Sequence, residues 1–266
     1  ANPNPGYGNC YAPTVTTNHV PVVTVPGSYT IPKSTPFALT GSATDEDNDV
    51  LSFCWEGTNI GTITPDVNTL ADLTQPPFFR SYGLVDSSGP TRNYPLLARI
   101  LDGTNYAKGD KLPSVGIVTT HRLTVRDNNA QGGGVSYGDV TVTVNGSIGP
   151  FLVTSNLAAS YAGNSTQTVT WSVNGTSTAT PDVAILLSTD GGITFPNVLL
   201  ATTTNDGTQT VTLPNVATTM ARLKVAAVGN IFFDISNSNF TITLAALSCP
   251  ANFATCLNAA PITLTG

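Results

Sequence analysis

The sequence predicts an all-β protein made of two sandwich domains. Short runs that alternate apolar and polar residues, such as TVTWSV (168–173) and TVTVNG (141–146), recur along the chain and are separated by Gly, Asn, Asp and Pro. No stretch places apolar residues at helical spacing for three turns. Glycine (24) and proline (19) are frequent, as in proteins built from strands and turns. The 266 residues are enough for two domains that each bury a core.

The first strand-rich block covers residues 23–147. A proline-rich arm, residues 1–22, precedes it, and the four prolines of the arm exclude a central strand. The expected strands lie in GSYTIP, FALTGSAT, VLSFCWEG, HRLTVRDN and GDVTVTV. Residues from about 57 to 120 show no clear alternation and are too many for a plain loop. We therefore expect an insertion packed on the sandwich, with a short helix at YPLLARI.

The second block covers residues 148–247 and follows a boundary at NGSIGP (145–150), where Gly, Ser and Pro interrupt the apolar rhythm. Its expected strands lie in FLVTS, QTVTWSV, DVAILLS, NVLLATT, TQTVTLP, ARLKVAAV and SNFTITL, which is the strand number of an immunoglobulin or fibronectin type III sandwich. In ARLKVAAV, Leu223 and Val225 share a core face while Arg222 and Lys224 point away. Residues 248–266 begin a new rhythm and are expected to be a tail or the start of a further module.

The charge balance limits the partners of this chain. A formal net charge of −6 and a pI near 4.6 argue against binding to nucleic acid and to anionic membrane surfaces. No run of about 18 apolar residues occurs, so membrane insertion is not expected. Four cysteines and only ten Lys and Arg residues suit an exported protein. We expect an extracellular or cell-surface location, with other protein modules, copies of the chain itself or an extracellular polymer as partners.

The strongest candidate site is the acidic run DEDND (45–49), which places Asp45, Asp47 and Asp49 at alternate positions. Carboxylates this close repel one another unless water, salt or a cation relieves the repulsion. The EF-hand template D-x-[DN]-x-[DN]-G-x5-E would end on Glu56, but it needs a glycine where Val50 stands. The residues that follow Val50 alternate like a strand, so we reject an EF-hand.

A loop of a β-sandwich can nevertheless bind calcium, because alternate Asp side chains in an extended turn face one way and supply oxygen ligands. We expect calcium as the cofactor and Asp127 and Asp139 as the more distant ligands. A solvated turn without a metal ion is the alternative. Bound calcium should raise the melting temperature of the first sandwich, whereas the second sandwich, which lacks such a run, should hardly respond.

The cysteines suggest a disulfide across the outside of the first sandwich. Strand parity places Cys54 on the opposite face from Trp55, so Trp55 is expected inside and Cys54 outside. This arrangement excludes the inter-sheet disulfide, packed on tryptophan, that marks antibody domains. We expect Cys54 to pair with Cys10 of the arm. Cys249 and Cys256 could pair with each other, or Cys256 could pair within a further module, and free thiols remain the alternative.

The run PPFFRSYG gathers Phe78, Phe79, Arg80 and Tyr82 within five residues. Such a group could form an aromatic platform for a sugar or a peptide. More often, a cluster of this kind seals an insertion onto the sheet beneath it.

Several of these segments resemble the paired Ig-like modules that follow the catalytic domain in secreted bacterial reprolysin-like zinc metalloproteases. The resemblance is carried by YTIPKSTPFALTGSATDEDNDVLSFCWEG, HRLTVRDNNAQGGGVSYGDVTVTV and ILLSTDGGITFPNVLLATTTNDGTQTVTLP. Similar modules occur in multidomain surface proteins and adhesins, and SCPANFATCLNAAPITLTG is similar to the opening of repeated modules in such proteins. The resemblance implies a PKD-like module, then a fibronectin III-like module, that act as a spacer, adhesion or binding region. The D-x-D-x-D loop is similar to loops that bind calcium in some PKD-like and cadherin-like modules.

The zinc signature of that family, HExxHxxGxxH, is missing. Only His19 and His121 exist, neither is followed by Glu, and no G-x-S-x-G sequence occurs, so no enzymatic activity is expected. A rival hypothesis is a structural subunit of an extracellular fibre. In that case, a terminal arm would add as a strand to the open sheet edge of a neighbouring copy.

Overall fold

The computed structural model describes residues 16–61, 74–82, 89–107, 109–155, 157 and 159–246, and its regular structure is almost entirely β, as predicted. The elements up to residue 145 are β1 (Val22–Thr24), β2 (Tyr29–Pro32), β3 (Phe37–Thr40), β4 (Ser42–Thr44), β5 (Ser52–Gly57), β6 (Thr91–Tyr94), α1 (Leu97–Leu101), β7 (Tyr106–Ala107), β8 (Asp110–Lys111), β9 (Ile117–Arg126) and β10 (Val135–Asn145). The later elements are β11 (Leu152–Val153), β12 (Ser160–Ala162), β13 (Thr166–Ser172), the 3-10 helix η1 (Thr176–Thr178), β14 (Asp182–Ser188), β15 (Asn197–Thr204), β16 (Thr208–Thr212), β17 (Thr218–Ala227), β18 (Phe233–Ile235) and β19 (Phe240–Thr243).

The first sandwich packs a sheet of order β2–β10–β9–β5 against the pairs β1–β4 and β3–β6. Strand β9 shows how the sequence produces this core. Its alternate residues His121, Leu123 and Val125 face inward and are fully buried, because side chains on a strand point to opposite faces in turn. Trp55 of β5 lies directly opposite Leu123 and is 1% exposed, which confirms the predicted inward face of that strand.

The region expected to be an insertion on the outside is in part core. Strand β6 pairs antiparallel with β3, and this pair forms part of the first sandwich. Tyr94 of β6 stacks on Phe37 of β3, with ring centroids 4.7 Å apart, and both side chains are buried. The predicted short helix at YPLLARI is confirmed as α1, which follows β6.

The second sandwich is built from the sheets β11–β13–β16 and β12–β19–β17–β14–β15, with β18 paired to β17. Inward residues of β13 and β17, among them Trp171 and Leu223, form its core. The strand patterns predicted from sequence correspond to β11, β13, β14, β15, β16, β17 and β19. Strands β12 and β18 were not expected, because three residues are too few to show an alternation.

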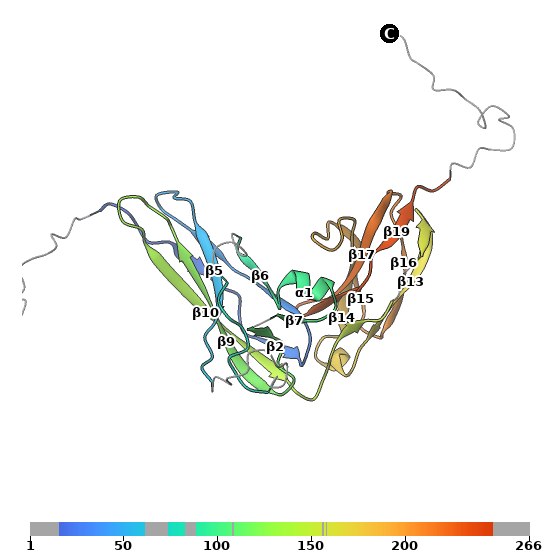
Figure 1. The fold of residues 1–266 in the computed structure, drawn as a ribbon, viewed down its shortest axis with the longest axis horizontal. Coiled ribbons are helices and arrows are strands. Elements are labelled where there is room, and N and C mark those ends of the chain that lie inside the picture. The colour runs from blue at the N-terminus through green and yellow to red at the C-terminus, as the bar shows by residue number, and fades with distance from the viewer. Residues whose placement is uncertain are drawn as a thin grey trace, which may run out of the picture.

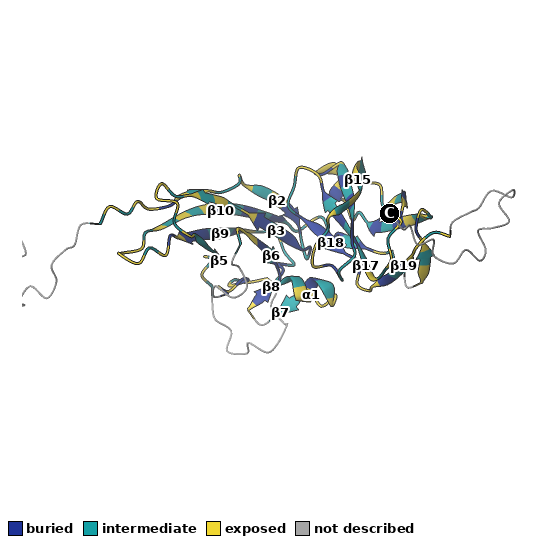
Figure 2. Cartoon of the chain, turned by 90° about the horizontal axis from the view of Figure 1, so that it is seen from above, coloured by how far each residue is buried: buried dark blue, intermediate teal, exposed yellow. Residues whose placement is uncertain are grey.

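The two sandwiches diverge from a shared junction, with α1 on the inner side between β6 and β17 (Figure 1). Figure 2 shows buried residues continuing from β3 to β18 across this junction. The sheets of the first sandwich end with β10 and those of the second begin with β11, close to the boundary read from NGSIGP. Among the described residues, no helix has the length and apolar character to cross a membrane. The tail 248–266 and most of the arm lie outside the described residues.

Candidate cation site in the acidic loop

The acidic loop, residues 45–49, begins directly after β4. Its shape is set by Asp45, whose Oδ1 accepts hydrogen bonds from the backbone N–H groups of Asp47 (3.0 Å) and Asp49 (3.2 Å). Asn48 adopts a left-handed conformation (φ 61°), which Asn tolerates better than most residues. This tight turn brings together one carboxylate oxygen from each of Asp45, Asp47 and Asp49, all within 4.8 Å of one another.

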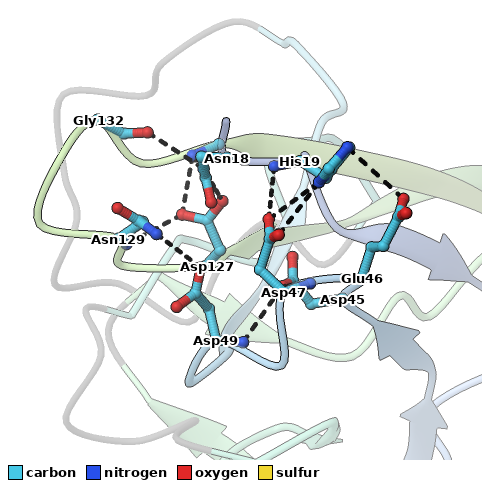
Figure 3. A network of polar contacts seen from close by, with 10 residues as sticks. Asn18, His19, Asp45, Glu46, Asp47, Asp49, Asp127, Asn129 and Gly132 are labelled. Atoms are coloured by element: carbon cyan, nitrogen blue, oxygen red, sulfur yellow. Dashed lines mark hydrogen bonds and ion pairs between the residues drawn. The ribbon is translucent and has the colours of Figure 1, made fainter. Parts of the chain in front are cut away.

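The turn between β9 and β10 meets the acidic loop from one side (Figure 3). Asn129 donates from Nδ2 to Asp49 Oδ2 (2.8 Å). Asp127 shapes this turn, because its carboxylate accepts hydrogen bonds from the backbone N–H groups of Asn129 (3.1 Å) and Gly134 (2.8 Å). The run DNNAQGGG is therefore a turn, as predicted, and its Asn129 side chain contacts the acidic loop.

The segment that precedes β1 meets the same loop from the other side. The backbone N–H of His19 donates to Asp47 Oδ2 (2.7 Å), and the imidazole Nδ1 lies 3.1 Å from Asp47 Oδ1. Asn18 donates from Nδ2 to Asp127 Oδ2 (2.7 Å). Three segments that are far apart in sequence thus converge on one cluster of oxygen atoms (Figure 3).

The electrostatics of the cluster follow from these contacts. The backbone and imidazole hydrogen bonds from His19 lower the pKa of Asp47. The hydrogen bond to Asp47 and the charge of Glu46 raise the pKa of His19. Burial acts to raise the pKa of Asp127, but hydrogen bonds from Asn18, Asn129 and Gly134 together outweigh burial and lower it. Asp47 and Asp127 are therefore ionised at neutral pH.

Two oxygen atoms in the cluster are buried and lack a hydrogen-bond partner, namely Asp45 Oδ2 and Asn18 Oδ1. A buried acceptor without a donor is costly, so each usually has a protein, water or metal partner. Besides the imidazole of His19, the available donors to a metal here are carboxylate and amide oxygens, which calcium prefers. The residues present therefore fit a calcium ion.

The structure does not bring every predicted ligand to this site. Asp139 lies on β10 beside Arg122 of β9 and forms a bidentate ion pair with it, with Nε–Oδ1 and Nη2–Oδ2 distances of 2.8 Å. Because Asp139 is four residues along the strand from Val135, it stands roughly 13 Å from the end that faces the acidic loop. The prediction that Asp139 joins this cluster is therefore wrong. The sequence did not single out Asn18 and Asn129, which contact Asp127 and Asp49. Glu56 accepts a hydrogen bond from Ser81 (2.7 Å).

Cys54 is not on an exposed face. Parity places it opposite to Trp55, as predicted, but the segment 81–82 covers that face and leaves Cys54 only 8% exposed. Its Sγ lies 3.6 Å from the carbonyl oxygen of Tyr82 and 3.7 Å from Ser81 Oγ. Cys54 is a free thiol, so the predicted Cys10–Cys54 disulfide is absent. Cys10 itself, like Cys249 and Cys256, lies outside the described residues, and the pairing of the last two stays a prediction.

The aromatic run at 78–82 is not an open ligand platform. Phe78, Phe79 and Tyr82 are 2%, 4% and 7% exposed, so they seal the covering segment onto the sandwich. Arg80 is exposed and stacks over the ring of Tyr82, 4.3 Å from its centroid. The sealing role, which was the alternative to the platform, is the one that the structure supports.

The second histidine belongs to the core of the first sandwich. His121 is fully buried between the rings of Phe37, Phe79 and Tyr94. Desolvation, reinforced by the charge of Arg92, lowers the pKa of His121 to about 3, so its imidazole is neutral. Its Nε2 lies 3.0 Å from Thr119 Oγ1.

No family model matches the chain, and no curated protein matches it. Among solved structures, the chain is similar to a chimeric titin Z1Z2-Z1Z2 tandem functionalised with a GRGDS peptide from fibronectin, at 14% identity over 85% of this chain and 100% of that chain, with a TM-score of 0.27. It is also similar to Sidekick-1 immunoglobulin domains 1–5 (11% identity, 86% and 40% coverage, TM-score 0.28) and to Clostridium thermocellum CbhA fibronectin(III)-like modules (9% identity, 84% and 94% coverage, TM-score 0.25). The strand pairing alone identifies the chain as two β-sandwiches in tandem.

Proposed function

We propose that this chain is a non-catalytic, extracellular pair of Ig-like modules that serves as a calcium-stabilised spacer or binding region of a larger secreted or cell-surface protein. The observation that carries the proposal is the convergence of residues 18–19, 45–49 and 127–134 on one cluster of oxygen atoms. The exported location is supported by composition, and a bacterial metalloprotease parent is supported only by the sequence resemblance.

Asp45, Asp47 and Asp49 would hold the calcium ion, and the unpartnered Oδ1 of Asn18 would be a further oxygen donor. Asp127 would orient Asn18 by accepting the hydrogen bond from its Nδ2. The ion would supply positive charge that relieves the repulsion among these carboxylates. Because Asn18 and His19 contact the same cluster, a bound ion would also fix the direction in which the preceding chain enters the first sandwich. A spacer needs such a defined entry point.

A calcium titration followed by amide NMR tests this proposal. Extracellular calcium modules commonly bind with dissociation constants of about 10⁻⁴ to 10⁻³ M, so the amides of residues 18–19, 45–49 and 127–134 should shift saturably in that range. Amides of β14 in the second sandwich should not shift. Asp47→Ala should abolish the saturable shifts, whereas Asp206→Ala, at an exposed aspartate of the second sandwich, should leave them unchanged. Shifts that are absent, or equal in the two variants, would contradict the proposal.

One sheet edge of the second sandwich is poorly suited to the strand addition that the fibre hypothesis requires. Strand β15 lies at the end of its sheet and pairs there with β14. Register shifts interrupt this pairing between Val183 and Ile185 and between Ile185 and Leu186. Irregularities of this kind twist an edge strand and hinder the addition of a further strand.

A further inference from the structure

One face of the second sandwich carries large apolar side chains that would be exposed if that sandwich stood alone. Phe233 and Ile235 of β18 pair with Ala226 and Lys224 of β17, so all four share the face opposite to the core residues Leu223 and Val225. Phe233 is 2% exposed and Ile235 is 1% exposed, although they lie outside the second sandwich's own core.

Helix α1 of the first sandwich covers this face. Ile100 of α1 is 1% exposed and forms one apolar cluster with Phe233 and Ile235. Leu97 and Leu101 of α1 pack against the same cluster, together with Ala38, Phe195 and Ala226. Gly192 lies against Leu101, and a Cβ atom at this position would displace the end of the Leu101 side chain.

Polar contacts reinforce the packing of α1. Arg222 of β17 donates from Nη1 to the carbonyl oxygen of Leu101 (2.6 Å), at the end of the helix where carbonyls lack partners within the helix. Lys224 lies over the ring of Phe233, with Nζ 3.8 Å from its centroid. Desolvation lowers the pKa of Lys224 to about 8, which agrees with a covered face.

The backbones of the two sandwiches also pair directly. Ala38 N donates to Ile231 O (3.1 Å) and Phe233 N donates to Pro36 O (2.9 Å), so the β6–β3 pair continues into the second sandwich. On the other side of the junction, Phe151 N donates to Thr35 Oγ1 (2.9 Å). Buried residues form one continuous cluster that includes both cores.

From these contacts we infer that α1 is a brace that makes the two sandwiches one cooperative folding unit with a fixed bend. The second sandwich is then not an independent domain, because without α1 it would expose Phe233 and Ile235 to water. This inference does not depend on calcium binding or on the spacer role.

The tryptophans allow a direct test, because the chain has two, Trp55 in the first sandwich and Trp171 in the second. The full chain is labelled with 5-fluorotryptophan, and urea unfolding is followed by the two fluorine NMR signals. In the unmodified chain, both signals should lose their native intensity at the same urea concentration. Two different midpoints in the unmodified chain would overturn the inference.

The matched variants are Ile100→Asp, at the buried face of α1, and Ala98→Asp, at an exposed position of the same helix. Ile100→Asp should separate the midpoints, with the Trp171 signal lost at a urea concentration lower by about 0.5 M or more. Ala98→Asp should keep the midpoints together. If Ile100→Asp does not fold, Ile100→Ala serves the same comparison. Coincident midpoints in the Ile100 variant, or equal separation in both variants, would show that α1 is not a brace.

Discussion

Asp234 is a buried carboxylate of the second sandwich, 4% exposed, that accepts a hydrogen bond from the backbone N–H of Val153 (2.7 Å). Burial raises the pKa of Asp234 from 3.8 to about 7. Between pH 3.8 and about pH 7, Asp234 therefore binds more protons in the folded chain than in the unfolded chain. The stability that this group contributes is therefore complete below about pH 4 and is lost as the pH rises through about 7.

We predict that Asp234→Asn flattens the fall in unfolding free energy between pH 5 and pH 8, because the neutral amide does not titrate. One pKa unit corresponds to about 1.4 kcal/mol, so the change of slope is measurable by urea denaturation at several pH values. A residual slope should persist, since burial also raises the pKa of Asp110 to about 6. Asp206→Asn should keep the slope of the unmodified chain, and an unchanged slope in Asp234→Asn would contradict the prediction.

Cys54 provides a second test at the level of one residue. Because the thiol is buried beneath residues 81–82, alkylation by iodoacetamide should be slow in the native protein and fast in urea. The modified peptide is identified by mass spectrometry without reduction. Recovery of Cys54 in a disulfide with Cys10 would contradict the structure.

Asp45, Asp47 and Asp49 are close along the chain. Their alternating pattern was therefore sufficient to predict that they lie together in one loop. Asn18 and Asn129 could not be assigned in the same way, because their position depends on which loops meet at one end of the sandwich. The DNN of the β9–β10 turn was the available signal for Asn129. For Cys54, parity predicted the face, but parity does not reveal what covers that face.

At the scale of elements, the segment 78–82 acts as a cover of the first sandwich. Phe79 contacts Phe37, Tyr94 and His121 with its ring, whereas Arg80 faces outward. We predict that Phe79→Ala costs about 3–5 kcal/mol of unfolding free energy, as large-to-small core substitutions of this type do. Arg80→Ala should cost about 1 kcal/mol or less, the value of its stacking on Tyr82. Equal costs in chemical denaturation would show that the segment does not pack as described.

Long strands were predictable and short ones were not. Strands β9 and β10 alternate over ten and eleven residues, and a period of two is clear at that length. Strand β6 covers four residues inside a region without visible alternation, and it is a strand because β3 offers a pairing edge. For Arg222 and Lys224, the pattern indicated a face that points away from the core, but it could not show that α1 packs on that face.

At the scale of the whole molecule, the junction changes an expectation drawn from the sequence. The acidic loop belongs to the first sandwich, so calcium was expected to stabilise that sandwich and hardly affect the second. Because α1 and the β3 backbone join the two sandwiches, the free energy of calcium binding should stabilise both together. Heating should then produce one transition that calcium moves as a whole.

Differential scanning calorimetry of the full chain, in excess chelator and in millimolar calcium, tests the calcium-stabilised spacer most directly. With dissociation constants of about 10⁻⁴ to 10⁻³ M, millimolar calcium should add about 0.4–1.4 kcal/mol, which raises the melting temperature by about 1–5 °C. Asp47→Ala should remove this increase and Asp206→Ala should retain it. The account predicts a single transition at a higher temperature in calcium, and an identical melting temperature in calcium and in chelator would contradict it.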